Sequence, residues 1–307
     1  MGQQTLADGW LDGLMKWCSD IVGPCQLVSD DERFHGRSGV YRLQTSSKFY
    51  YLKVHQKCSS WEREVHGYEN WSAVFGAWVP ELIAIHPGEP WALLISELPG
   101  QIMGKVPLSR EHEQQVWYVA GRELGKLHDF TTGEYFGPSK RDGSPLGPHA
   151  RKACEYVSTE FQRLIDIGLK GGYLTDGELE VVQKTLDQVS VFEGEKPVPC
   201  HRDYGPDNWL VTEKGIWSGV IDFEFSSWDL RVVDFARYPN WEWIHRPDLL
   251  DAFFDGYGRP LTSVEALQCL ILRSQYALGA IVWGHENEFY GFEKEGREAL
   301  RYIACLI

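Results

Sequence analysis

The chain has 307 residues, and 43% of them are hydrophobic, which is enough to fill the core of one large domain or two modest ones. Its 30 basic and 44 acidic residues leave a formal net charge of −14, which repels phosphate backbones, so we expect no nucleic-acid partner. Seven cysteines at irregular spacing, with no C-x-x-C pair, favour reduced thiols over disulfides or a zinc site, and with them a cytoplasmic location.

The N-terminus predicts neither export nor membrane attachment. The first ten residues, MGQQTLADGW, have no basic segment and no apolar one, so we expect no signal peptide. The longest strongly apolar stretch, around Ala277–Gly284, is far shorter than the ~20 residues that cross a bilayer. We therefore expect no membrane span.

A hairpin is predicted over residues 40–54, where the β-prone runs VYRLQT and FYYLKV are joined by a short polar link. Strand alternation places the ammonium of Lys53 on a largely aromatic face. Just before the hairpin, Gly36, Ser38 and Gly39 predict a loop whose backbone N–H groups can approach a phosphate.

A helix is predicted next, because apolar residues recur at helical spacing in SSWEREVHGYENW, residues 59–71. Glu64 lies on the inward face of this helix, and a buried carboxylate requires a cation. The run WALLISELPG, residues 91–100, then indicates an apolar strand that a Pro-Gly pair ends. We place a boundary between two lobes near residue 98.

The second half of the chain is expected to be mainly helical. Apolar residues at helical spacing predict three helices, over residues 116–127, 156–165 and 179–189. Further on, Pro247 is placed to open a helix, and Thr262 with Glu265 forms a capping box before another.

A dense polar stretch, CHRDYGPDNWLV at residues 200–211, leads into a second predicted hairpin around Lys214–Gly215, whose strands are the β-prone runs Trp209–Val211 and Ile216–Ile221. With the turn there, Asn208 pairs close to Ile221, and antiparallel neighbours lie ~5 Å apart. Asn208 and Asp222 should therefore converge. An amide oxygen and a carboxylate are hard ligands that suit Mg²⁺.

Asp203 stands just upstream of this pair. In phosphoryl transfer, one carboxylate orients an attacking hydroxyl and accepts its proton, while other groups hold metal on the nucleotide. The pattern H-R-D-x-x-x-x-N over residues 201–208 has the spacing of a kinase catalytic loop. We therefore predict Asp203 as the catalytic base, beside a magnesium site.

Taken together, these motifs resemble the protein-kinase-like superfamily and, within it, the aminoglycoside phosphotransferase and choline kinase families of small-molecule kinases. In family order, the motifs are YYLKV with Lys53, WEREV with Glu64, HRDYGPDN with Asp203 and Asn208, VIDFE with Asp222, and WDLRVVDFAR with Asp229 and Asp234. The resemblance covers most of the chain. It implies an α+β, bilobal, protein-kinase-like fold, with an antiparallel-sheet lobe over residues 1–98 and a mainly helical lobe over residues 99–307.

The resemblance also implies how a nucleotide is held. Lys53 would contact the α- and β-phosphates of ATP and be held in place by Glu64. The segment ISELPG would be the hinge between the lobes, where the backbone of Ser96, Glu97 and Leu98 meets adenine.

For the catalytic centre, the resemblance implies that Asp203 is the base and that Asn208 and Asp222 bind magnesium. Asp234 would brace the catalytic loop rather than touch substrate, and His201 would be structural as well. No substrate-binding residue is assigned.

Two positions depart from the family patterns. Arg202 stands where the bacterial families usually have Gly, and Phe223-Glu224 replaces the Phe-Gly that follows the metal-binding Asp of protein kinases. No A-P-E segment follows Asp222. A small-molecule acceptor is therefore favoured over a protein.

The expected function is ATP- and Mg²⁺-dependent phosphorylation of a small-molecule hydroxyl, with an aminoglycoside-like polycation favoured by the acidic chain. Choline or ethanolamine is the alternative, because Tyr238, Trp241 and Trp243 follow the metal site and aromatic faces attract quaternary ammonium. A homoserine-type acceptor and a nucleotide-binding pseudokinase that serves as an interaction module are further alternatives. The carboxylates that could line an acidic pocket are Asp248, Asp251, Glu286 and Glu288.

Overall fold

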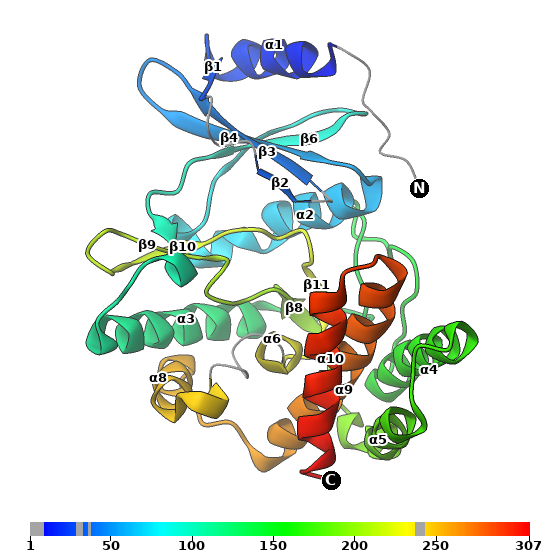
Figure 1. The fold of residues 1–307 in the computed structure, drawn as a ribbon. Coiled ribbons are helices and arrows are strands. Elements are labelled where there is room, and N and C mark those ends of the chain that lie inside the picture. The colour runs from blue at the N-terminus through cyan, green and yellow to red at the C-terminus, as the bar shows by residue number, and fades with distance from the viewer. Residues whose placement is uncertain (1–8, 29–32, 36–37, 237–242) are drawn as a thin grey trace.

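The computed structural model describes residues 9–28, 33–35, 38–236 and 243–307, which form two lobes (Figure 1). The N-terminal lobe is built on an antiparallel sheet with the strand order β1-β3-β4-β6-β5, and β2 pairs with β3. The strands are β1 (Gln26–Leu27), β2 (Arg33–His35), β3 (Ser38–Gln44), β4 (Phe49–His55), β5 (Leu82–Ile85) and β6 (Trp91–Ser96). The helices of this lobe are α1 (Trp10–Val22), α2 (Cys58–Asn70) and the 3-10 helix η1 (Ser72–Trp78).

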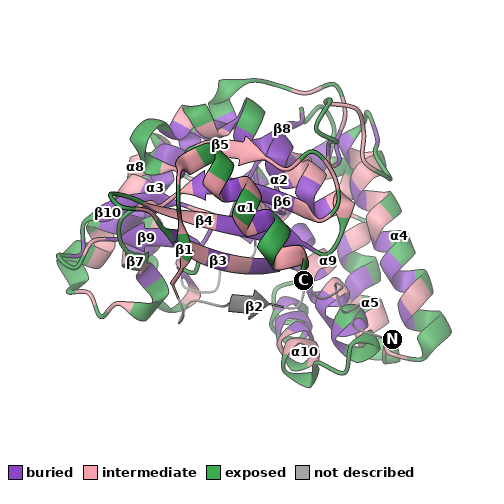
Figure 2. Ribbon diagram, turned by 90° about the horizontal axis from the view of Figure 1, so that it is seen from above, coloured by how far each residue is buried: buried purple, intermediate pink, exposed green. Residues whose placement is uncertain are grey.

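Strand alternation decides which helix covers which face of this sheet. Leu52 and Val54 of β4 pack with Leu14 of α1 in a small core, and Figure 2 shows α1 lying over the sheet. Lys53, between them in β4, faces the opposite side, where Val65 of α2 joins the main core of the molecule. The predicted hairpin and the predicted faces of its second strand are confirmed.

The C-terminal lobe is mainly helical, as expected. Its helices are the 3-10 helix η2 (Met103–Lys105), α3 (Arg110–Phe130), α4 (Ala153–Gly171), α5 (Asp176–Leu186), η3 (Val189–Phe192), α6 (Val233–Ala236), α8 (Pro247–Tyr257), α9 (Ser263–Glu286) and α10 (Tyr290–Ala304). Two small sheets complete it: β7 (Gln101–Ile102), β9 (Trp209–Val211) and β10 (Trp217–Val220) form one, and β8 (Val198–Cys200) and β11 (Ser227–Asp229) the other.

The predicted helix starts are confirmed by their caps. Pro247 occupies the first turn of α8, where a missing N–H costs nothing. The Thr262 side chain accepts from the Glu265 N–H, and the Glu265 carboxylate accepts from the Thr262 N–H, which completes the capping box of α9. Among the described residues, no helix combines the length and the apolar character needed to cross a membrane.

Three local predictions are wrong. Ser38 and Gly39 are the first residues of β3, paired with His55 and Val54, rather than part of a loop, while Gly36 lies outside the described residues. The helix predicted to Val189 ends at Leu186, and Val189 begins a 3-10 turn. The exposed Ile216 precedes β10, because its carbonyl closes the turn by accepting from the Thr212 N–H.

Helices α3 and α8 cross at closely packed glycines. A Cβ on Gly121 would overlap the carbonyl oxygen of Phe253, and a Cβ on Gly256 would overlap that of Tyr118. Two backbones in contact leave no room for any side chain at the crossing. This close packing holds α8 against α3, the helix whose Ala120 carbonyl accepts from the hydroxyl of Tyr204 in the predicted catalytic loop.

We expect Gly256→Ala to destabilise the protein by about 3 kcal/mol, because the overlap is with backbone and the two helices must separate. The matched control is Gly177→Ala in α5, where no atom lies near the added methyl and a gain of about 0.5 kcal/mol is expected. Urea unfolding of both variants measures the difference. Equal stabilities would show that the α3–α8 crossing is not closely packed.

Candidate active site

Lys53 lies at the centre of a charge cluster that joins the two lobes. It occupies the middle of β4, where it pairs with Val40 on β3 and Leu93 on β6, and its side chain is buried. The ammonium lies 2.9 Å from Glu64 Oε2, 2.7 Å from Asp222 Oδ1 and 3.5 Å from Glu224 Oε2. The structure therefore brings Lys53 together with Glu64, as the sequence predicts, and adds contacts with Asp222 and Glu224.

The charges in this cluster alter each other's pKa values. Burial by itself lowers the pKa of Lys53, but the carboxylates of Asp222, Glu64 and Glu224 outweigh it and hold the pKa well above its usual value. For Asp222, the ammonium outweighs burial and the pKa falls. For Glu224, burial together with Asp222 and Glu64 outweighs Lys53, and the pKa rises. Three carboxylates thus surround one ammonium.

Glu64 is held from two sides. It is fully buried on the inward face of α2, as its helical spacing predicts. Besides Lys53, it contacts His55, whose Nε2 lies 2.6 Å from Glu64 Oε2 and whose Nδ1 lies 3.8 Å from Glu224 Oε2. Sequence reasoning missed His55, although its position two residues after Lys53 places both on one face of β4.

The predicted catalytic loop lies between β8 and β9. The Asn208 amide donates to Asp203 Oδ2 at 2.9 Å and to the Asp203 carbonyl at 2.8 Å, so these two predicted residues are joined directly. The His201 ring is fully buried, lies 3.0 Å through Nε2 from the Ile221 carbonyl, and accepts from the Asp203 N–H at 3.3 Å. The loop is thus closed on itself, with Asp203 held by its neighbours.

The second predicted hairpin is confirmed, and it carries Asp222 to the site. The Ile221 N–H donates to the Asn208 carbonyl at 3.0 Å, which is the predicted register and places Asp222 one residue beyond Asn208's partner. The Asn208 side chain bonds Asp203, whereas that of Asp222 bonds Lys53. Among the described non-glycine residues, φ is positive only at Arg202, Asp222 and Glu288, so two of the three are in this site.

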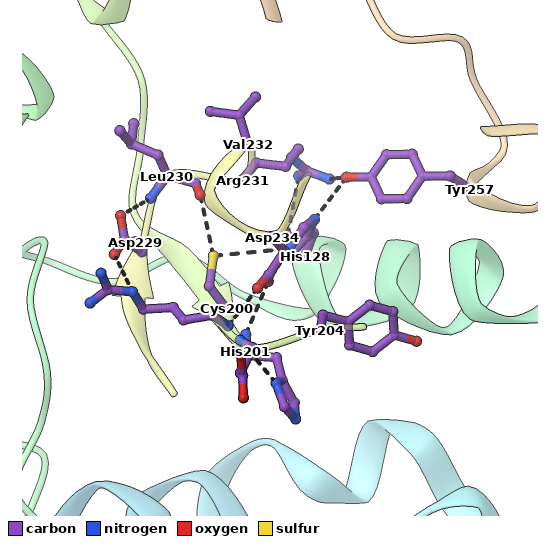
Figure 3. A network of polar contacts seen from close by, with 12 residues as sticks. His128, Cys200, His201, Tyr204, Asp229, Leu230, Arg231, Val232, Asp234 and Tyr257 are labelled. Atoms are coloured by element: carbon purple, nitrogen blue, oxygen red, sulfur yellow. Dashed lines mark hydrogen bonds and ion pairs between the residues drawn. The ribbon is translucent and has the colours of Figure 1, made fainter. Parts of the chain in front are cut away.

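Asp234 braces the catalytic loop (Figure 3). Its carboxylate accepts from the backbone N–H groups of His201 and Arg202 and lies 3.0 Å from His128 Nε2. Burial lowers the pKa of His128 despite Asp234, which favours a neutral ring that donates to Asp234 and accepts from the Tyr257 hydroxyl. His128 lies in the LGKLHD segment of α3 and is a polar residue on an apolar face, which sequence reasoning did not single out.

Arg202 and Asp229 explain one departure from the family patterns. The Arg202 Nε lies 3.2 Å from Asp229 Oδ2, which also accepts from the Tyr156 hydroxyl. The arginine therefore has a partner within the chain. Its neighbour Tyr204 is also fixed, because the buried hydroxyl donates to the Ala120 carbonyl on α3.

The hinge predicted at residues 96–98 follows β6. The N–H groups of Ser96 and Glu97 donate to the carbonyls of Glu81 and Phe49, and the Glu97 carboxylate pairs with Arg42. The lobe boundary near residue 98 stays a prediction. A cavity of about 1060 Å³ lies beside the hinge, but neither Lys53 nor Asp203 lines it, so it is separate from the charge cluster.

The aromatic and acidic residues proposed for a substrate pocket are not brought together in the described structure. Trp243 is buried in the core against Phe253, while Tyr238 and Trp241 lie outside the described residues. Asp248 is paired with Arg110 and Arg246, so its charge is already neutralised. The remaining acidic candidates, Asp251, Glu286 and Glu288, are exposed.

The chain belongs to the phosphotransferase enzyme family, whose sequence model matches residues 33–267. Solved structures share its fold. A thermostable mutant of aminoglycoside phosphotransferase APH(4)-Ia, in ternary complex with AMP-PNP and hygromycin B, matches with a TM-score of 0.71 at 13% identity, over 95% of this chain and 97% of that one. The GDP complex of aminoglycoside 2'-phosphotransferase-IIIa matches with a TM-score of 0.69 at 12% identity, over 96% and 97%.

ADP-bound aminoglycoside phosphotransferase APH(2'')-Ib is similar too, with a TM-score of 0.66 at 17% identity, over 96% of this chain and 97% of that one. No curated protein matches the chain. The predicted bilobal, protein-kinase-like α+β fold is therefore confirmed, and so is the class of the protein, a phosphotransferase of the kinase type.

We expect Asp234→Asn to destabilise the protein by about 3 kcal/mol, because an amide replaces a buried carboxylate that accepts two backbone N–H groups and contacts His128. The control is Asp129→Asn, whose exposed carboxylate pairs with Arg231 and should change stability by less than about 0.5 kcal/mol. Chemical denaturation compares the two. A loss below 1 kcal/mol at Asp234 would be inconsistent with a bracing role.

Proposed function

We propose that the protein is an ATP- and Mg²⁺-dependent kinase that transfers the γ-phosphate to a hydroxyl of a small molecule, with an aminoglycoside-like polycation as acceptor. One observation carries this proposal: the Lys53 ammonium of the N-terminal lobe lies 2.7 Å from Asp222 Oδ1 of the C-terminal lobe. A cation for phosphate and a carboxylate for metal would thus meet in the same place. The hairpin that carries Asp222 begins at Asn208, whose side chain bonds Asp203.

The residues present fit a magnesium ion. Asp222 and Asn208 offer hard oxygen ligands, and the Asn208 amide nitrogen is committed to Asp203, which leaves the amide oxygen to face a metal. The excess of carboxylates around Lys53 is a charge arrangement that a divalent cation relieves. When bound, Mg²⁺ would neutralise charge on the phosphate oxygens.

The roles of the remaining residues follow from their positions. Lys53, kept charged by its carboxylates, would bind the α- and β-phosphates, while Glu64 holds its ammonium. The N–H groups of Ser96 and Glu97 already donate to carbonyls of the N-terminal lobe. The Leu98 N–H is therefore the donor that this segment would offer to adenine. Ser38 and Gly39 lie on β3 beside the strand of Lys53, where their backbone would cover the phosphates.

Asp203 would act as the general base. Its carboxylate takes the proton of the acceptor hydroxyl as that oxygen bonds to the γ-phosphorus. The bond from the γ-phosphorus to the β–γ bridging oxygen breaks, and ADP leaves. Asn208 and the His201 ring fix the orientation of Asp203, and Asp234 fixes the loop that carries all of them.

For the acceptor, the net charge of −14 supports a polycation. Similar solved structures add support, because that of APH(4)-Ia is a complex with hygromycin B and that of APH(2")-IIia a complex with kanamycin. Of the three aromatic residues considered for binding choline, the structure describes Trp243, which is part of the core. This weakens the support for a choline-type acceptor. The pseudokinase alternative finds no support in the site, where Lys53, Asp203, Asn208 and Asp222 are all present.

We expect Asp203→Asn to lower turnover about 10²- to 10⁴-fold while leaving Mg-ATP affinity nearly unchanged, because it removes the proton acceptor and keeps the shape. The measurement is Mg²⁺-dependent ADP release over a panel of aminoglycosides, choline, ethanolamine, homoserine and simple sugars. An acceptor that stimulates ADP release only with the wild-type protein identifies the substrate class. Wild-type turnover in the variant would exclude Asp203 as the base.

We expect Asp222→Ala to abolish magnesium-dependent binding of ATP, because it removes the only carboxylate proposed as a metal ligand. Calorimetric titration of ATP with and without Mg²⁺ measures this effect. Asp187→Ala, at the exposed end of α5, is the control and should bind as the wild type does. If Mg-ATP binds the Asp222 variant with unchanged affinity, the proposed metal site is wrong.

A further inference from the structure

A loop of the C-terminal lobe, residues 131–152 between α3 and α4, reaches α2 of the N-terminal lobe. The loop is held by its own contacts, because the Tyr135 hydroxyl contacts both Ser139 Oγ and the Gly143 carbonyl. It is tied to β11 by the Gly137 N–H, which donates to the Trp228 carbonyl. The loop is therefore a fixed part of the C-terminal lobe.

Arg141, at the tip of this loop, contacts one face of α2. Its guanidinium holds the Glu69 carboxylate with two nitrogens, at 2.7 Å from Nη2 and 3.0 Å from Nε. Its backbone N–H donates to Glu62 Oε2. A hydrogen bond with the Arg141 backbone raises the pKa of His66, but burial has the larger effect and lowers it. Glu62, His66 and Glu69 are spaced i, i+4, i+7, so they lie on the same side of the helix.

The opposite face of α2 carries Glu64 towards Lys53. A helix is rigid along its length, so a shift of α2 by an ångström would move Glu64 away from the ammonium that it holds at 2.9 Å. The C-terminal lobe also meets α2 at Ser226, whose hydroxyl donates to the Arg63 carbonyl, and at Trp228, whose ring lies 5.0 Å from that of Trp71. Arg141 adds the charged contact to this interface.

We propose that Arg141 is a positioning residue for nucleotide binding: by clamping Glu69 and Glu62 it holds α2 so that Glu64 presents Lys53 to the phosphates. All of these contacts form within the chain itself. A bidentate arginine–carboxylate pair fixes direction as well as distance, which a lysine would not do. This inference rests on the proposed function, in which Lys53 binds the phosphates of ATP.

The test uses the full chain and two probes, Mg-ATP and adenosine, with affinities measured by calorimetry. Arg141→Ala should weaken Mg-ATP binding by about 3- to 10-fold and leave adenosine binding unchanged, because only the phosphate contacts pass through Lys53. Glu69→Gln should behave in the same way. The matched control is Arg163→Ala. Arg163 forms a similarly exposed bidentate pair with Glu160, but both residues lie on α4, away from α2.

A double-mutant cycle separates positioning from general stability. In a Glu64→Gln background, Arg141→Ala should have no further effect on Mg-ATP binding, since the residue through which it acts is gone. The inference is overturned if Arg141→Ala leaves Mg-ATP affinity unchanged or weakens adenosine binding to the same extent. It is also overturned if Arg141→Ala has its full effect on Mg-ATP binding in the Glu64→Gln background. If the wild-type protein fails to bind Mg-ATP at all, the proposed function itself is wrong, and this inference is wrong with it.

Discussion

The arrangement of the two lobes depends on one buried ammonium. Lys53 is a cation in the interior of the protein, and an ion there is stable only if carboxylates surround it. Glu64 comes from a helix of its own lobe, but Asp222 and Glu224 come from the other lobe. Charge compensation therefore brings the two lobes together at the site proposed to bind phosphate and metal.

In the predicted catalytic loop, buried polar groups likewise offset an unfavourable local feature. Its backbone adopts a left-handed conformation at Arg202, which costs free energy for any residue with a side chain. Asp234 offsets that cost by accepting two consecutive backbone N–H groups, and His128 and Tyr257 hold Asp234 in turn. A chain of buried polar contacts thus runs from α8 to Asp203, and each member has its partner.

The sequence predicted those features that depend on short-range periodicity. Two-residue alternation placed Lys53 opposite the small core under α1, helical spacing placed Glu64 inward, and hairpin pairing placed Asn208 beside Ile221. It missed contacts between elements far apart along the chain. Glu224 meets Lys53 across 171 positions of sequence, and Arg141 meets Glu69 across 72, and no local pattern encodes either pair.

By itself, the sequence determined the family, the two kinds of lobe and the residues that carry charge into the site, because these depend on motif order and on the side-chain period of a strand or helix. Only the tertiary structure decided the partners of those charges. It showed that His55 shares Glu64 with Lys53, that Asp229 neutralises Arg202, and that Trp243 belongs to the core. The reason is physical: a buried charge is compensated by whichever groups the packed fold places within about 4 Å, irrespective of their distance along the chain.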